Sequence, residues 1–235
     1  MPTSPAETTT SAVAACVDFD AVVAARHSVR GFRAEPVPRA LLEHVFTLAG
    51  QAPSNCNTQP WLAAVASGKT CERLRARLTE DFAAGRASMD FPYSGRYDGV
   101  YRDRQHDAAA RLYAAQGIAR DDKAARGIAF GRNFDFFGAP HAAFLFLPEW
   151  GGVREAADLG MYAQTLMLAL SAHGVGSCPQ TALSFCADAV RAELGVASHW
   201  RLVFGISIGY EDPADPANAC RIPRAVLTDT TRFVD

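Results

Sequence analysis

The segment RHSVR, residues 26–30, places three hydrogen-bond donors, Arg26, Ser28 and Arg30, at alternating positions. In an extended chain, alternating side chains point to the same side. Two guanidinium groups and a hydroxyl on one side suit a phosphate or another anionic group. The same arginines could instead lie on the surface at a helix end, where positive charge is favourable. The segment alone leaves both interpretations open.

A second basic pair, Arg221 and Arg224, lies near the C-terminus after a proline-rich loop. Taken by itself, the pair is typical of a solvated surface. Together with the first segment it could complete an anion site. The spacing does not establish that the two segments meet.

Two polar segments adjoin apolar runs. The stretch APSNCNTQPW, residues 52–61, holds prolines, asparagines, a serine, a threonine and a glutamine. Gln180 and Thr181 follow the longest helix-like run. Turn formation explains the first segment, and a turn with a helix cap explains the second, where Ser184 is the better cap. Each segment is also a candidate for the polar rim of a binding pocket.

Other chemistries find little support. The glycines Gly174 and Gly176 follow a helix, whereas a dinucleotide fingerprint needs a strand first. The six cysteines form no CxxC pair and no cluster with histidine at ligand spacing, so neither a zinc site nor a disulfide scaffold is expected. Cys178 could be a nucleophile, but no motif supports it, and a small buried thiol is the commoner role.

The composition is that of a globular protein. The chain has 235 residues, 49% hydrophobic and 20% charged, which fits one large domain or two small ones. A net charge of −2 gives no electrostatic signal for nucleic acid or a membrane surface. Residues 1–16 resemble a disordered arm rather than a secretory signal, and the apolar run LMLALSA is too short to span a bilayer. We therefore expect a cytoplasmic protein.

Hydrophobic periodicity predicts intermixed helices and strands in one α/β or α+β domain. We expect helices at 18–26, 38–51, 70–85, 102–117, 120–136, 154–174 and 185–195. Strands are expected at 61–66, 141–148 and 201–210, an irregular excursion at 87–101, and an extended tail at 224–235. The helix at 154–174 is apolar nearly all round, which predicts a position in a core or between two subunits.

In this order, the pieces resemble the FMN-dependent nitroreductase family. The matching segments are RHSVRGF, APSNCNTQPW, APHAAFLF, AADLGMYAQTLMLALSAHGVGSCPQ, FGISIGYEDP and RIPR. The segments DFPYSGRYDGVYRDRQ and RNFDFFGAPH are most similar to the nitrobenzoate-reductase-like group. The resemblance implies a single α+β domain at 17–235, with a mixed sheet flanked by helices. It also implies an interlocked homodimer whose C-terminal segment crosses to the partner and whose interface holds FMN.

The resemblance further implies which residues hold the cofactor. Arg26 and Ser28 match residues on the phosphate and ribityl chain, with the backbone of His27 alongside, and Arg30 matches a basic residue near the pyrimidine edge of the flavin. Pro53, Ser54 and Asn57 match a partner-chain loop on the ring system, Gln180 and Thr181 match a loop under the central ring, and Arg221 and Arg224 match a basic pair on the phosphate. Asn133 or Arg132 falls near a further flavin position.

The implied activity is ping-pong electron transfer from NAD(P)H through flavin N5 to a nitroaromatic, a quinone or a similar planar acceptor. Because the flavin supplies the redox chemistry, no catalytic side chain is expected. The aromatic-rich part of the excursion, residues 91–101, is a candidate roof for the acceptor pocket. The alternative is a protein that stores or sequesters FMN and turns over poorly.

Overall fold

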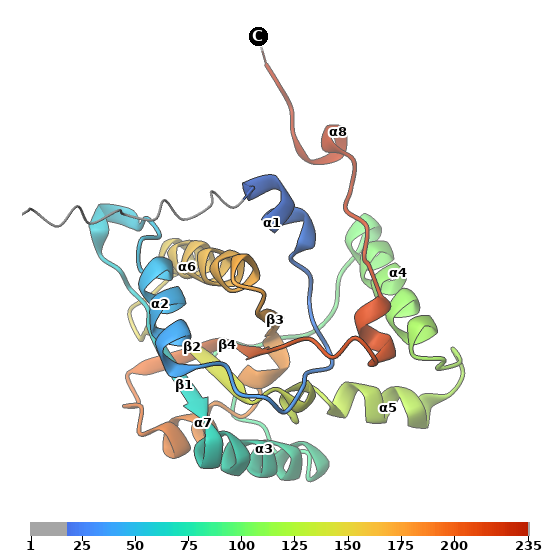
Figure 1. Ribbon diagram of the computed structural model, residues 1–235, viewed down its shortest axis with the longest axis horizontal. Coiled ribbons are helices and arrows are strands. Elements are labelled where there is room, and N and C mark those ends of the chain that lie inside the picture. The colour runs from blue at the N-terminus through green and yellow to red at the C-terminus, as the bar shows by residue number, and fades with distance from the viewer. Residues whose placement is uncertain (1–17, 235) are drawn as a thin grey trace, which may run out of the picture.

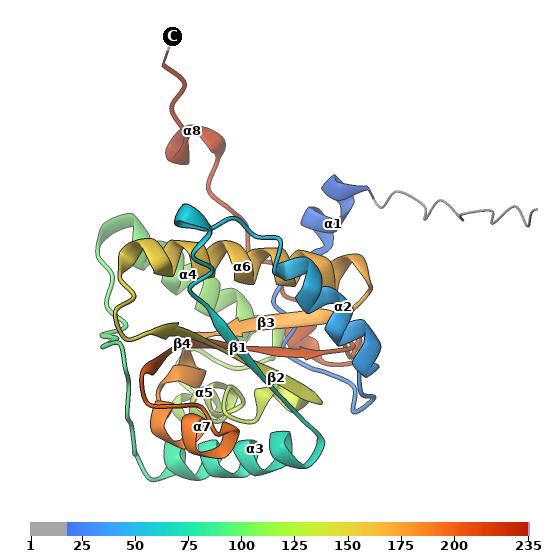
Figure 2. The same ribbon diagram turned by 90° about the vertical axis from the view of Figure 1, so that its left-hand side faces the viewer.

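A four-stranded antiparallel sheet lies at the centre of the computed structural model, which describes residues 18–234. The sheet has the order β1-β2-β4-β3. Its strands are β1 (Leu62–Ser67), β2 (His141–Pro148), β3 (Gly176–Gln180) and β4 (Trp200–Gly209). Helices cover both faces, so the molecule has three layers (Figures 1 and 2). The arm predicted at residues 1–16 lies outside the described residues.

The central strand β2 is buried along its whole length. Because successive side chains of a strand point to opposite faces, its residues divide between two hydrophobic clusters. Phe144 and Phe146 belong to one cluster, whereas Leu145 and Leu147 belong to the other. A strand buried on both faces appears in the sequence as a continuous apolar run, which is how HAAFLFLP predicted it.

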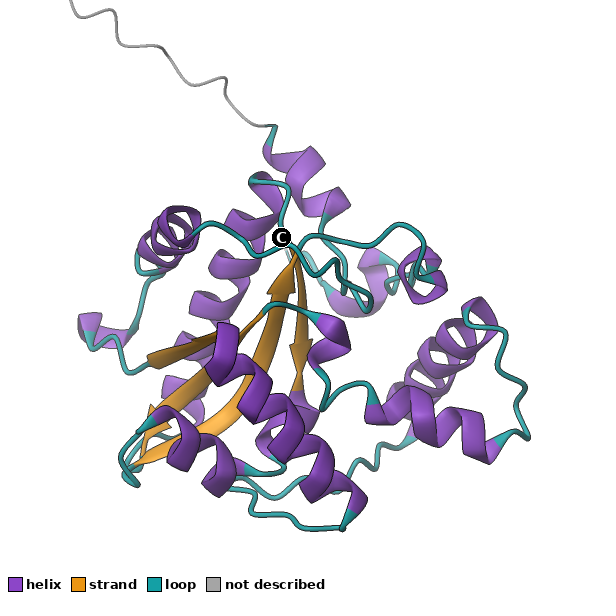
Figure 3. Cartoon of the chain, turned by 60° about the horizontal axis from the view of Figure 1, so that its bottom comes forward, coloured by secondary structure: helices purple, strands orange, loops and turns teal. Residues whose placement is uncertain are grey.

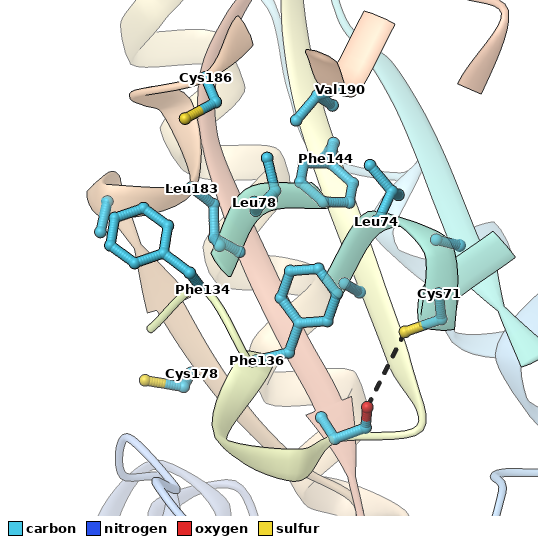
Figure 4. Packing of buried hydrophobic residues seen from close by; sticks show 14 of the residues in the cluster. Cys71, Leu74, Leu78, Phe134, Phe136, Phe144, Cys178, Leu183, Cys186 and Val190 are labelled. Carbon is cyan, nitrogen blue, oxygen red and sulfur yellow. Dashed lines mark hydrogen bonds between the residues drawn. The ribbon is translucent and has the colours of Figure 1, made fainter. Parts of the chain in front are cut away.

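Different helices cover the two faces. α2 (Arg39–Ala49) and α6 (Val153–Ala172) pack on one face, and α3 (Gly68–Ala83) and α7 (Ala187–Leu194) lie on the other (Figure 2). Two 3₁₀ turns, η2 (Phe136–Gly138) and η3 (Thr181–Ser184), add buried side chains to the second face. Figure 4 shows Phe136 and Leu183 packed with Leu74 and Leu78 of α3.

The remaining helices surround this body. α4 (Gly99–Ala115) and α5 (Lys123–Gly131) lie together to one side of the sheet (Figures 1 and 3). α1 (Phe19–Ala25) lies near α6, and α8 (Leu227–Thr230) belongs to a C-terminal segment that extends away from the body (Figure 1). Within residues 18–234, none of the helices is long and apolar enough to cross a membrane.

The predicted strands β1, β2 and β4 and the long helix α6 are confirmed. Gly174 follows α6 with a φ of +70°, a conformation that glycine adopts at little cost. Only one side of α6 lies on the sheet, through Leu159, Leu166 and Leu170, while Met161 on the other side is 40% exposed. Within residues 18–234, part of the outer face of α6 is therefore exposed.

Three expectations about elements were wrong, and one strand was missed. The helix expected at 120–136 ends at Gly131, because the chain turns there to bury Phe134, Phe136 and Phe137. β3 was not predicted, and the tail contains one helical turn. Ser184 does not cap α7: the capping position belongs to Cys186, and the Ser184 hydroxyl donates to the carbonyl of Thr181 over 2.8 Å.

Candidate functional site

The segment RHSVR is extended, as the alternation of its donors requires. α1 ends at Ala25, and the backbone of the next residue, Arg26, is already extended. The Val29 N–H donates to the carbonyl of Ser177 over 3.0 Å, so the segment lies beside the start of β3. Val29 is buried in the core, and Arg26, Ser28 and Arg30 line a cavity instead.

This cavity has a volume of about 670 Å³ and brings the two basic segments together. Arg221 and Arg224 line it along with the first segment, although they follow it by about 190 residues. Residues of the α6 helix and β3 complete its wall, namely Gln164, Met167 and Pro179. The volume is within the range of roughly 300–1,000 Å³ that is usual for cofactor sites.

The cavity is strongly positive. Among residues 18–234, no carboxylate forms an ion pair with Arg26, Arg30, Arg221 or Arg224, and no acidic residue lines the cavity. Burial lowers the pKa of Arg26, and the charge of Arg224 lowers it further. Two arginines that repel each other without a countercharge are typical of a site built for an anion.

Cys178 lies beside this cavity but is not a reactive thiol. It is 1% exposed, and burial raises its pKa to about 11, so it stays protonated at neutral pH. Figure 4 shows it at the edge of the hydrophobic cluster. The geometry therefore gives no support to nucleophilic catalysis by Cys178.

Gln180 and Thr181 lie where β3 ends and η3 begins, directly after Pro179 in the cavity wall. The side chain of Gln180 is buried and accepts a hydrogen bond from the Ser207 hydroxyl. It also donates to the backbone carbonyl of Asn133 over 2.9 Å. The side chain is therefore used inside the protein, which leaves the backbone of this loop for contact with a ligand.

The loop APSNCNTQPW does not reach the cavity within one protomer. Pro53 and Asn57 are exposed and Ser54 is half-buried. The loop includes the 3₁₀ turn η1 (Asn55–Asn57), whose first N–H donates to Asp158 of α6 over 3.1 Å. The structure thus places the predicted contacts Pro53, Ser54 and Asn57 along α6, apart from the arginine cluster.

This loop is held in a costly conformation. Cys56, Asn57 and Gln59 have φ values of 50°, 56° and 47°, in the left-handed region that favours glycine. Hydrogen bonds within the loop maintain it: the Gln59 N–H donates to Ser54 Oγ over 2.9 Å, and the Gln59 side chain donates to Asn57 Oδ1 over 3.2 Å. Strained backbone that the surroundings hold in place is concentrated at functional sites.

Two residues that were not found from the sequence, Asn218 and Asp215, support Arg30 from behind together with Arg132, which the resemblance had placed near the flavin. Asn218, in the 3₁₀ turn η4 (Pro216–Ala219), accepts a hydrogen bond from the Arg30 N–H over 2.7 Å. Arg132 donates to the Arg30 carbonyl over 2.9 Å and to Asp215 Oδ2 over 2.6 Å. Asn218 and Asp215 lie in a loop whose composition is typical of a turn, so no pattern in the sequence distinguished them.

The donor set fits a molecule with a phosphate group. Four arginines without countercharges and the Ser28 hydroxyl face one cavity of suitable volume, and arginine forks match phosphate oxygens. The nitroreductase family model matches residues 23–210 of this chain.

Individual relatives agree with that match. Nitroreductase NfnB of Mycolicibacterium smegmatis is 50% identical over 216 residues, which cover 90% of this chain and 91% of that protein. The 4-nitrobenzoate reductase of Pseudomonas putida is 34% identical over 220 residues, covering 92% and 96%. The crystal structure of the FMN-dependent nitroreductase NfnB from Mycobacterium smegmatis in complex with NADPH has a TM-score of 0.89 and 48% identity, covering 92% of this chain and 97% of that one. This chain belongs to the nitroreductase family.

Proposed function

We propose that this protein is an FMN-dependent oxidoreductase that takes electrons from NAD(P)H and delivers them to nitroaromatic acceptors. The observation that carries the proposal is the cavity of about 670 Å³ in which Arg26, Arg30, Arg221 and Arg224 meet without countercharges. The relatives support the rest, since one is described as FMN-dependent and in complex with NADPH, and another as a 4-nitrobenzoate reductase.

Each part of the cavity has a role in this proposal. Arg26, Ser28, Arg221 and Arg224 bind the FMN phosphate, with the backbone of His27 beside it. When bound, the flavin supplies the redox chemistry between the nicotinamide and the acceptor. Arg30 places positive charge near the ring system, which favours a reduced, anionic flavin. The Arg30 side chain is held for this by a hydrogen bond to the Ser28 carbonyl over 3.3 Å.

We also propose that two such chains, each a single domain, form a homodimer. Within residues 18–234, part of the outer face of α6 is exposed, and the C-terminal segment beyond Arg224 extends away from the body of its own chain (Figures 1 and 2). A second copy would cover both features. It would also give Pro53, Ser54 and Asn57 a flavin to contact, namely the one held by the partner's arginines, and the backbone at Gln180 and Thr181 would contact it from the other side.

The family resemblance also admits quinones and similar planar electrophiles as acceptors, and the excursion at 91–101 as the roof of their pocket. The partners of this protein are expected to be small molecules and a second copy of the same chain. We expect the protein to act in the cytoplasm. The alternative of a flavin store finds no support among the relatives above, which are named as reductases.

The test has two steps. The purified protein, loaded with FMN, should be yellow, and anaerobic mixing with NADPH should bleach the flavin absorbance within the time of one turnover. Adding 4-nitrobenzoate should then restore the absorbance. A protein that does not retain FMN on desalting would refute the proposal. A protein that binds FMN, but whose flavin is reduced by neither NADPH nor NADH, would favour the storage alternative.

A further inference from the structure

Asn218 is a buried polar residue whose hydrogen-bonding capacity is fully used. Its side chain is 4% exposed. Its Oδ1 accepts from the Arg30 N–H over 2.7 Å, and its Nδ2 donates to the carbonyls of Gly31 and Asp212 over 2.8 and 2.9 Å. An amide with both hydrogens and its oxygen satisfied inside a protein has one fixed orientation.

The side-chain amide of Asn218 bonds to the backbone of two adjacent residues. The N–H of Arg30 and the carbonyl of Gly31 belong to adjacent residues, and the one amide group of Asn218 bonds to both. The Asp212 N–H also donates to the Gly31 carbonyl over 3.0 Å. This part of the first basic segment is therefore tied to the 212–218 loop by three hydrogen bonds.

The same loop packs closely against Gly31. A Cβ atom built on Gly31 would lie 2.3 Å from Cβ and Cγ of Asp215, so a larger residue cannot fit without displacing the loop. Asp215 is held in turn by Arg132, which also bonds to the Arg30 carbonyl. The contact is thus close as well as hydrogen-bonded, which leaves little freedom for one segment to move against the other.

Asn218 also contacts the second basic segment. Its main-chain carbonyl accepts a hydrogen bond from Nη1 of Arg221. One residue therefore connects Arg30 through its side chain with Arg221 through its backbone. Arg30 belongs to the first group of arginines that line the cavity, and Arg221 belongs to the second.

We propose that Asn218 is a positioning residue that sets the spacing between the two basic segments and so shapes the site for the phosphate. It touches no ligand itself and acts through Arg30 and Arg221. The proposal rests on the proposed function for the identity of the ligand, FMN. Arginines of both segments are assigned to the phosphate, whereas Arg30 is the one arginine assigned to the ring. Since placement of a charge-assisted donor is sensitive to small displacements, loss of Asn218 should weaken binding of the phosphate more than binding of the ring.

The experiment compares FMN with riboflavin, which has the same ring and ribityl chain but no phosphate. Dissociation constants of both are measured on the flavin-free dimer by quenching of flavin fluorescence. In the Asn218→Leu variant, which keeps the branched shape of the side chain but loses its three hydrogen bonds, the preference for FMN over riboflavin should fall by about tenfold or more. Affinity for riboflavin should fall by less than affinity for FMN, because Arg30 is the one arginine assigned to the ring.

Ser88→Ala is the matched control. The Ser88 hydroxyl accepts from the Asp188 N–H over 3.0 Å, a side-chain-to-backbone bond at the start of α7, on the other side of the sheet from α6. This variant should keep the wild-type ratio. Asn218→Ser, which retains one hydroxyl, decides the question if the leucine variant does not fold.

The outcomes separate the two proposals. A wild-type protein that binds FMN no better than riboflavin overturns the phosphate site and, with it, the proposed function. A wild-type protein that strongly prefers FMN, together with Asn218 variants that keep this preference or lose affinity for both flavins equally, overturns the positioning role alone.

Discussion

At the scale of single residues, the arginine cluster shows how a binding site can oppose the stability of the protein that contains it. Arg26 is partly buried, and its pKa is lowered by that burial and by the charge of Arg224. Because no carboxylate of residues 18–234 lines the cavity, this repulsion is present whenever the anion is absent. A bound phosphate would turn the same charges into attractive contacts.

The first prediction follows from this change from repulsion between the arginines to attraction between the arginines and the phosphate. Arg26→Ala and Arg224→Ala should each weaken FMN binding by about 10- to 150-fold, because a charge-assisted hydrogen bond contributes roughly 1.5–3 kcal/mol. The flavin-free form of each variant should melt no lower than the flavin-free wild type. Dialysis followed by absorbance measures the first effect, and thermal unfolding of the flavin-free protein measures the second.

Arg33→Ala is the control, because Arg33 is an exposed arginine close to the same segment that does not line the cavity. It should leave FMN binding unchanged. Full retention of yellow colour after dialysis of both cavity variants would contradict the assignment of these arginines to the phosphate.

The second prediction concerns His141, at the first position of β2. His141 is 4% exposed; its Nε2 accepts from the Val37 N–H over 2.9 Å, and its Nδ1 lies 2.7 Å from the Ser67 hydroxyl. Because the Val37 N–H points at Nε2, this arrangement requires the neutral ring. Burial lowers the pKa of His141 from its ordinary value of 6.5.

The sign of the pH dependence follows. Well above the ordinary pKa of about 6.5, the histidine is neutral in both the folded and the unfolded chain, so the free energy of unfolding does not change with pH through this group. As the pH falls, the unfolded chain binds the proton first, so the free energy of unfolding decreases until the folded form is also protonated. Urea unfolding between about pH 7.5 and about pH 5 should show this decrease, and His141→Gln should reduce its slope.

Ser67→Ala separates the titration from the hydrogen bond. This variant loses the Ser67 contact and keeps the histidine, so it should be less stable at every pH and retain the slope. A His141→Gln variant with the slope of the wild type would show that other groups cause the acid sensitivity.

At the scale of elements, a helix or strand could be predicted where its own residues carry a clear hydrophobic pattern or stop signal. β2 and α6 were predicted because their apolar patterns are long and continuous. β3 was missed because it is five residues long and contains Pro179, which lacks an N–H. Its place at the edge of the sheet accommodates the proline. The end of α5 was missed because packing of three phenylalanines, rather than a local stop signal, ends the helix.

The residues of the candidate site also differ in whether the sequence alone identifies them. Residue type and alternation made Arg26 and Arg30 candidates for an anion site. The family resemblance then added Arg221 and Arg224 and implied a place on the flavin for all four. Asn218 was not found, because an asparagine near prolines and aspartates is typical of a turn. Only its partners, residues 30 and 31, distinguish it, and they are about 190 residues away in the sequence.

The third prediction separates the backbone of the 52–61 loop from its side chains. Asn57 has a φ of 56°, so Asn57→Gly relieves strain whereas Asn57→Ala increases it. If the Asn57 side chain contacts the partner's flavin, both variants should bind FMN more weakly, although the glycine variant is at least as stable as the wild type. Thermal unfolding and FMN titration measure the two properties.

Cys56→Gly is the control in the same loop. Cys56 is also exposed and has a φ of 50°, but the family resemblance gives it no flavin contact. Its FMN affinity should match that of the wild type. An Asn57→Gly variant with unchanged FMN affinity would remove this side chain from the site.

At the scale of the whole molecule, the sheet and its two cores are well buried, yet large apolar side chains remain exposed. Among them, Phe233 and Val234 in the C-terminal segment are 77% and 83% exposed, and Met161 on the outer face of α6 is 40% exposed. Exposed apolar surface of this kind can mark an interface between proteins.

The last prediction tests that interface and the site together. A chain truncated after Arg224 keeps every arginine of the cavity but loses the segment that extends from the body (Figure 1). If this segment and α6 bind a second copy, the truncated protein should sediment as a monomer, or as a much weaker dimer than the full chain. It should also bind FMN more weakly, because Pro53, Ser54 and Asn57 would no longer reach a partner's flavin.

A substitution on the other side of the sheet distinguishes loss of an interface from loss of any exposed apolar group. Ile128 on α5 is 73% exposed, and α5 and α6 lie on opposite sides of the sheet (Figure 2). Ile128→Ser should sediment like the wild type and keep its FMN affinity, whereas Met161→Glu should behave like the truncated chain. A truncated protein that is monomeric and still binds FMN with full affinity would mean that one protomer suffices for the site, and that the strained 52–61 loop has another purpose.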